Sequence, residues 1–190
     1  CREINGEEVE WSENLYKGEY VNDLAQEFLE KGGEVIVEQA GPYALNEILG
    51  WLRRDLEGFN VTFDKCFSEI SLYDSDMVQK AIDWLKQKGL MYEKDGALWF
   101  RSTDFGDDKD RVVIRENGEP TYFASDIAYN HDKFQRGFNT LINIWGADHH
   151  GYIPRMKAVV QALGHDKESL KVLLVQMVSL LRNGQPVTMS

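Results

Sequence analysis

Residues 140–180 read TLINIWGADHHGYIPRMKAVVQALGHDKESLKVLLVQMVSL, and this stretch decides the fold class. The apolar run 140–146 predicts a buried strand, and 171–180 predicts a second one. Between them, residues 152–164 have helical spacing, with Pro154 where a first turn accepts it. Strand, helix, strand with apolar strands is typical of a parallel sheet covered by helices. We therefore predict an α/β fold with a doubly wound parallel sheet.

Upstream of this stretch, apolar residues recur at helical spacing in several segments that end at glycine or a polar residue. The predicted helices cover residues 19–33, 43–60, 75–89 and 125–137. A small antiparallel β region is expected among them. Residues 61–69 alternate like a strand, and two β-rich runs flank Asn117 and Gly118, the strongest short hairpin signal. We predict that residues 61–125 are an α+β subregion inserted into one domain of residues 1–190.

Composition narrows the function classes. The chain is 43% hydrophobic, which suffices for a sizeable core, and its net charge of -11 gives no general attraction to nucleic acid or anionic lipid. No apolar run approaches a membrane span and the N-terminus does not resemble a signal peptide, so we expect a cytoplasmic protein. Cys1 and Cys66 form no paired motif, which argues against a disulfide scaffold. The chain starts at Cys1 and stops without a helix stop, so we expect both ends to be cut.

The loop after the first apolar strand is a candidate site, because ligands of parallel sheets bind beyond the carboxyl ends of strands. Gly146 would let the backbone approach a ligand closely. Asp148 could accept a hydrogen bond from a ligand hydroxyl or bind a cation. His149 and His150 lie near the predicted helix start. Adjacent histidines cannot easily share one ion, so a metal centre is disfavoured. A nucleotide or substrate site and a merely polar helix start remain equally good interpretations.

A second candidate site lies in TYFASDIAYN, residues 121–130. Tyr122 would end an apolar strand and Asp126 would follow near a helix start, so a phenol and a carboxylate could converge on one pocket. Asp126, or Ser125 before it, is equally acceptable as a plain helix N-cap. The acidic run 104–110 lacks the spacing of a calcium loop, which favours a solvated turn. No Walker A, GxSxG or GxGxxG sequence is present.

Four segments together identify a resemblance to a known family. They are YKGEYVNDLA, FSEISLYDSDMV, GLMYEKDGALWFRSTDFGDDKDRVVIRENGEPTYFASDIAYNHDKFQRG and NIWGADHHGYIPRMKAVVQALG. They resemble the catalytic region of bacterial-type arginyl-tRNA synthetases over nearly the whole chain. The resemblance implies that the predicted sheet is part of a Rossmann-like domain and that the longer parent protein joins L-arginine to tRNA(Arg) with ATP and Mg²⁺, through an arginyl adenylate.

The resemblance also implies roles for the two candidate sites. Tyr122, Asp126 and Asp148 would bind arginine, because a carboxylate matches the planar guanidinium with paired charge-assisted hydrogen bonds. ATP would be bound by four residues: Gly146, His149, His150 and Val178. No structural metal is implied.

This sequence departs from the family pattern at the two phosphate-binding motifs. A HIGH-type sequence does not occur, and KMSKS is represented only by VTMS at the end of the chain, with Thr188 in place of the first lysine. Thr188, Met189 and Ser190 would be the remnant of that catalytic motif. Losing one preorganised donor can cost about 10²–10³ in rate. We therefore expect the 190 residues alone to be inactive, whereas the parent protein is an active and monomeric ligase.

Three other interpretations compete with this one. The first is a noncatalytic module that binds an adenylate or a protein partner. The second is a class I synthetase for cysteine or methionine, which the absence of a suitable Cys/His set disfavours. The third is a metal-dependent hydrolase built on Asp126, Asp148, His149 and His150. An incomplete sheet would also expose apolar surface, so we expect the isolated chain to self-associate.

Overall fold

A computed structural model describes residues 1–10 and 18–187, and the chain divides into two compact units. The first unit includes Cys1–Cys66 and the second is Phe67–Val187. Among the described residues, no helix is both long enough and apolar enough to cross a membrane.

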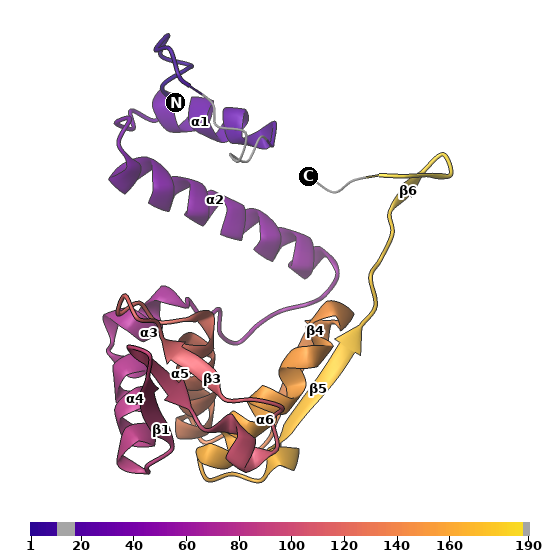
Figure 1. Cartoon of the computed structure of the whole chain (residues 1–190). Helices are drawn as coiled ribbons and strands as arrows, with labels where there is room; N and C mark the ends of the chain where they lie inside the picture. The colour runs from indigo at the N-terminus through magenta and orange to yellow at the C-terminus, as the bar shows by residue number, and fades with distance from the viewer. Residues whose placement is uncertain (11–17, 188–190) are drawn as a thin grey trace. The chain divides into compact units, whose positions relative to one another are not determined.

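The first unit is helical, with α1 at Tyr20–Glu30 and α2 at Val37–Gly58 (Figure 1). Phe28 of α1 is buried and its ring lies 5.1 Å from that of Tyr43 in α2. Helix α2 has the predicted row of apolar side chains along one face. This face does not form part of a core, because no α2 residue is buried. The exposed side chains of that face are Leu45, Leu49, Leu52 and Leu56.

The second unit holds the remaining elements. Its helices are α3 (Ile70–Asp74), α4 (Met77–Gln87), α5 (Tyr122–Gln135) and α6 (Ile153–Ala162), and its 3₁₀ turns are η1 (Ser102–Phe105), η2 (Ala147–Tyr152) and η3 (Lys167–Ser169). Its strands are β1 (Met91–Lys94), β2 (Ala97–Phe100), β3 (Arg111–Ile114), β4 (Leu141–Gly146), β5 (Leu170–Val175), β6 (Leu181–Arg182) and β7 (Gln185–Pro186).

Strands β4 and β5 form the predicted parallel pair, with α6 as the crossover (Figure 1). The register runs from Leu141 opposite Leu170 to Gly146 opposite Val175. This parallel pair with its crossover helix, together with the antiparallel sheet β1-β2-β3, confirms the predicted α/β class. The expectation that both strands are fully buried was wrong for the described chain, because alternate residues such as Ile144 are exposed.

An antiparallel sheet of order β1-β2-β3 forms the small β region that the sequence predicted. It shares a core with α4 and α5, in which Leu85, Phe100 and Ile127 are completely buried. The strand expected at 61–69 was wrong, since no strand forms there. The turn at Asn117 and Gly118 forms, but its return strand is reduced to a single bridge between Ile114 and Pro120. The boundary of an inserted subregion at 61–125 stays a prediction.

Candidate functional site

A cavity of about 370 Å³ opens in the second unit where α5, β4, η2 and α6 meet. We call it the Tyr122–Asp126 cavity, after two of its lining residues. The complete lining consists of Tyr122, Asp126, Trp145, His149, Tyr152 and Met156. The structure thus brings together residues from both candidate sites that the sequence singled out.

Tyr122 and Asp126 share the cavity because both lie on the first turns of α5. Thr121 precedes the helix in an extended conformation, and its hydroxyl donates to the carbonyl oxygens of Val112 and Val113 on β3. Residues four apart on a helix share one face, so the phenol and the carboxylate point the same way. Tyr122 therefore starts a helix and does not end a strand, which corrects that part of the prediction. Neither Asp126 nor Ser125 is the N-cap.

Asp126 is a carboxylate in an unfavourable environment. Its burial, followed by the negative charge of Glu69, raises the pKa of Asp126 to about 6, while Arg155 and Lys133 act in the opposite direction. A positively charged ligand in the cavity would relieve that strain. The electrostatics of the site therefore favour binding of a cation.

Glu69 supplies a second carboxylate that sequence reasoning did not single out. It lies at the start of α3 and accepts a 2.6 Å hydrogen bond from the Ser125 hydroxyl. Glu69, Ser125 and Asp126 line one further cavity of about 200 Å³. Glu69 is 56 residues from Ser125 in sequence, so spacing could not have placed the two side chains together. The only sequence signal for Glu69 was that it lies within the segment FSEISLYDS.

The loop after β4 is the 3₁₀ turn η2, which leads directly into α6. A Cβ on Gly146 would meet Oδ1 of Asp148, so a larger residue there would have to turn the Asp148 carboxylate aside. His149 Nε2 lies 3.6 Å from Asp148 Oδ2, and His150 Nδ1 lies 3.0 Å from the Ala147 carbonyl oxygen. His149 lines the Tyr122–Asp126 cavity, whereas Asp148 and His150 are not among its lining residues.

Tyr152 and Arg155 form a stacked pair beside this loop. The Arg155 guanidinium lies 4.1 Å from the centre of the Tyr152 ring. Its Nε atom is buried and has no hydrogen-bond partner within the described ranges 1–10 and 18–187. Arg155 is also close enough to Asp126 to lower its pKa. Arg155 on α6 is therefore a cationic group beside two lining residues of the cavity, Tyr152 and Asp126, that sequence reasoning missed.

The remaining predicted site residues lie away from this cavity or beyond the described chain. Val178 lies between β5 and β6, outside any helix or strand, and is 75% exposed. Thr188, Met189 and Ser190 lie outside the described residues. Within the part of the chain that is described, no group of three or more histidine, cysteine, aspartate or glutamate side chains could hold a metal ion.

Comparison with known proteins gives a consistent result. The family model for the catalytic domain of class I tRNA synthetases of the arginine type matches residues 13–188. The arginine–tRNA ligase of Syntrophotalea carbinolica is 53% identical over 100% of this chain and 36% of its own length. The arginine–tRNA ligase 1 of Halalkalibacterium halodurans is 49% identical over 97% of this chain and 35% of its own length. The chain thus spans about a third of these relatives.

A crystal structure from Campylobacter jejuni, assigned as an arginyl-tRNA synthetase, is similar with a TM-score of 0.87 and 44% identity. The match covers 99% of this chain and 42% of that one. The arginyl-tRNA synthetase of Plasmodium falciparum shares the fold at 16% identity, with a TM-score of 0.54 over 71% of this chain and 24% of its own. The family match over almost the whole chain, together with these relatives, shows that the chain belongs to the catalytic-domain family of class I arginyl-tRNA synthetases.

Proposed function

We propose that the complete protein carrying this chain is an arginine–tRNA ligase. It activates L-arginine with ATP to an enzyme-bound arginyl adenylate and then transfers the arginyl group to the terminal ribose of tRNA(Arg). The proposal rests on the family and on relatives that are named as arginine–tRNA ligases. Because the chain spans about a third of those relatives, the activity is proposed for the complete protein.

The single observation that carries the substrate assignment is the pairing of Tyr122 and Asp126 in one cavity, with Glu69 close behind. Two carboxylates near one ligand position favour a cation that offers several N–H donors at once. A guanidinium is planar, stays charged at all relevant pH values and presents five donors in a fixed fork. Lysine offers one compact ammonium group on a flexible stem, so it would satisfy only part of this arrangement.

The proposed roles divide the site residues into an arginine-binding group and an ATP-binding group. Asp126 pairs with the guanidinium, Tyr122 contacts it from the rim, and Asp148 contributes from the loop. Gly146, His149, His150 and Val178 are proposed to contact ATP. Thr188, Met189 and Ser190 are proposed to belong to the second phosphate-binding motif, and ATP enters with Mg²⁺ as the substrate complex.

The proposed setting is the cytoplasm, where a monomeric parent protein meets tRNA(Arg). The 190-residue chain by itself is expected to be inactive, because the family's first phosphate-binding motif does not occur in it. An aminoacylation assay of the isolated chain beside the complete protein checks this expectation. Product above background from the isolated chain would contradict it.

Aminoacylation of tRNA by the complete protein tests the substrate assignment. Asp126→Ala should raise the KM for arginine by about 10²-fold or more, and leave the KM for ATP within about twofold. Asp83→Ala is a matched control, since Asp83 is an exposed carboxylate on α4 that accepts a hydrogen bond from Gln79 of the same helix. Equal increases in both KM values for Asp126→Ala, or no charging with arginine by the wild type, would contradict the proposal.

A further inference from the structure

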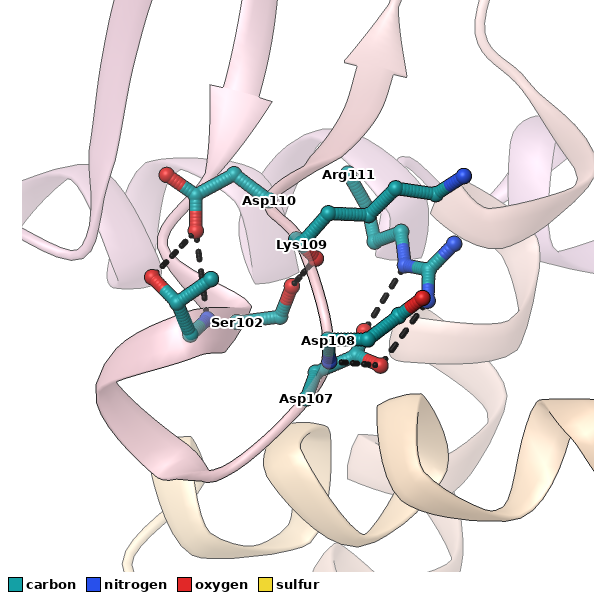
Figure 2. Close-up of polar contacts among 7 residues, drawn as sticks. Ser102, Asp107, Asp108, Lys109, Asp110 and Arg111 are labelled. Atoms are coloured by element: carbon teal, nitrogen blue, oxygen red, sulfur yellow. Dashed lines mark hydrogen bonds and ion pairs between the residues drawn. The ribbon is translucent and has the colours of Figure 1, made fainter.

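Buried polar groups of the second unit are bonded in two different ways. The first is a network in the acidic run 104–110, where the predicted solvated turn was wrong. Asp107 is buried there, and its carboxylate accepts hydrogen bonds from Arg111, at 2.7 Å from Nε and 2.8 Å from a terminal nitrogen (Figure 2). Figure 2 also shows the Ser102 hydroxyl, which donates to the Lys109 carbonyl oxygen. These contacts join residues close in sequence, so this network supports the local fold.

The second kind of contact is made by Ser125, which is buried on α5. The Ser125 hydroxyl oxygen lies 2.6 Å from Oε1 of Glu69 and 2.9 Å from the Tyr122 carbonyl oxygen. The contact with Tyr122 is the ordinary bond of a serine to its own helix. The contact with Glu69 spans 56 residues of sequence and reaches α3, which packs against α5. Ser125 therefore ties a second carboxylate to the helix that carries Asp126.

The Glu69 side chain depends on this tertiary contact for its orientation. Glu69 is exposed and directly precedes α3, but its carboxylate makes no capping hydrogen bond to that helix. A long exposed side chain samples several rotamers, and ordering it costs conformational entropy. Hydrogen bonds to an ionised carboxylate are roughly twice as strong as neutral ones. The bond from Ser125 therefore selects one orientation of the Glu69 carboxylate.

That orientation places Glu69 beside both residues that are proposed to bind arginine. Glu69 and Asp126 line the cavity of about 200 Å³, and Glu69 and Tyr122 line another of about 430 Å³. Tyr122 and Asp126 also line the Tyr122–Asp126 cavity. In agreement with this placement, the charge of Glu69 adds to the effect of burial in raising the pKa of Asp126. Two neighbouring carboxylates repel each other, so an exposed glutamate without an anchor would turn toward solvent.

We propose that Ser125 is a positioning residue for arginine recognition, because its buried hydroxyl holds the Glu69 carboxylate beside Asp126. The inference rests on the proposed function, which assigns the Tyr122–Asp126 cavity to arginine. Ser125 acts through Glu69 and does not touch the substrate. The hydroxyl orders the second carboxylate before arginine arrives, and a preorganised group loses less entropy when the ligand binds.

Kinetics of the complete protein test this role. Ser125→Ala should raise the KM for arginine by about 5- to 20-fold, with kcat and the KM for ATP changed less than about twofold. Ser125→Thr keeps the hydroxyl, and the cavity of about 200 Å³ beside it leaves room for the added methyl group. Its KM for arginine should stay within about threefold of the wild-type value. Ser75→Ala is the matched control, since the Ser75 hydroxyl donates to the Ser71 carbonyl oxygen, and it should leave both KM values unchanged.

Asp107→Asn shows what a general loss of stability does in the same assay. This variant removes the charge from the buried pair with Arg111, so it should lower the melting temperature of the complete protein. Its KM for arginine should rise no more than its KM for ATP. If Asp107→Asn instead raises the KM for arginine selectively and as much as Ser125→Ala does, the effect of Ser125→Ala is one of stability and the inference fails.

A double-mutant cycle tests whether Ser125 acts through Glu69. Glu69→Ala removes the carboxylate that the hydroxyl holds. In the Glu69→Ala background, Ser125→Ala should add less than about twofold to the KM for arginine. Full additivity of the two substitutions would overturn the inference. Equal increases in both KM values for Ser125→Ala, or a Ser125→Thr variant as impaired as Ser125→Ala, would also overturn it.

Asp126→Ala in the same assay separates the two proposals. If Asp126→Ala raises the KM for arginine selectively and Ser125→Ala does not, the inference fails and the proposed function stands. If Asp126→Ala has no selective effect, the assignment of the cavity to arginine fails and the inference falls with it.

Discussion

Asp126 is a buried carboxylate whose surroundings oppose its charge. Burial and the nearby Glu69 raise its pKa to about 6, and only part of this effect is offset by Arg155 and Lys133. A group with a raised pKa in the folded state costs stability when it ionises. Functional sites often keep such groups because ligand binding recovers the cost. Asp126 therefore links the stability of the fold to the chemistry proposed for the cavity.

Replacing the carboxylate should stabilise the protein at neutral pH. The pKa of Asp126 is about 6 in the folded state and 3.8 in the unfolded state, so the folded protein holds the proton more tightly. The contribution of this proton to the free energy of unfolding is fully present below pH 3.8 and is lost as the pH rises through about 6. Asp126→Asn should therefore increase the free energy of unfolding at pH 7.5 by about 1 to 2 kcal/mol, and much less at pH 4. Urea unfolding at both pH values measures the difference. A variant that is less stable at pH 7.5 would contradict this account.

The ionisation of Asp126 should also make the KM for arginine depend on pH. Above pH 6 Asp126 is ionised and the KM for arginine should be constant, whereas below pH 6 it should rise by up to about tenfold per pH unit. Arg155→Met removes a nearby cation, so the pKa of Asp126 should rise and the midpoint should move to higher pH by about half a unit or more. The pH profile of KM for ATP serves as the control. An unchanged midpoint in Arg155→Met would show that Arg155 does not act on Asp126.

The sequence could predict part of this site. Tyr122 and Asp126 were recognisable because they are close in sequence, and four-residue spacing on a helix places them together whichever residue begins that helix. Glu69 and Arg155 were not predictable from spacing, because tertiary packing of α3 and α6 brings them to Asp126. Resemblance to a family indicated the ligand, but packing determined the electrostatics.

At the scale of elements, α2 and α4 show what an apolar pattern can and cannot predict. Both helices were expected from the spacing of their apolar residues, and both form. Leu85 of α4 is completely buried, whereas Leu52 of α2 is 52% exposed. Periodicity indicates that a helix has an apolar face, but it does not identify what covers that face. The alternating apolar and polar residues at 61–69 wrongly predicted a strand. A strand needs a neighbouring strand to pair with, and none pairs with this segment in the described chain.

This contrast predicts unequal effects of one substitution. Leu85→Ala should lower the free energy of unfolding by about 2 to 5 kcal/mol, because it leaves a cavity in the core between α4, α5 and the antiparallel sheet. Leu52→Ala should cost less than about 1 kcal/mol, since the side chain is already half in solvent. Urea unfolding followed by circular dichroism gives both values. Equal losses would mean that Leu52 is covered in solution.

At the scale of the whole molecule, the parallel pair β4–β5 leaves one apolar face uncovered in the described chain. Its exposed residues are Ile142, Ile144, Leu173 and Val175. They lie on one face, because alternate residues of a strand point the same way and Ile144 is opposite Leu173 in the register. A doubly wound sheet has helices on both faces, so this face lacks the second layer.

An uncovered apolar face of this kind should drive self-association of the 190-residue chain. Analytical ultracentrifugation should show species larger than a monomer, in proportions that increase with concentration. The double variant Ile142→Thr, Ile144→Thr keeps β-compatible side chains and should shift the distribution toward monomer. Leu49→Gln, Leu52→Gln on α2 is the control, because it also replaces two exposed apolar side chains, on a different element. If the control restores the monomer and the sheet variant does not, α2 is the contact surface. A chain that stays monomeric at its highest soluble concentration would contradict the prediction entirely.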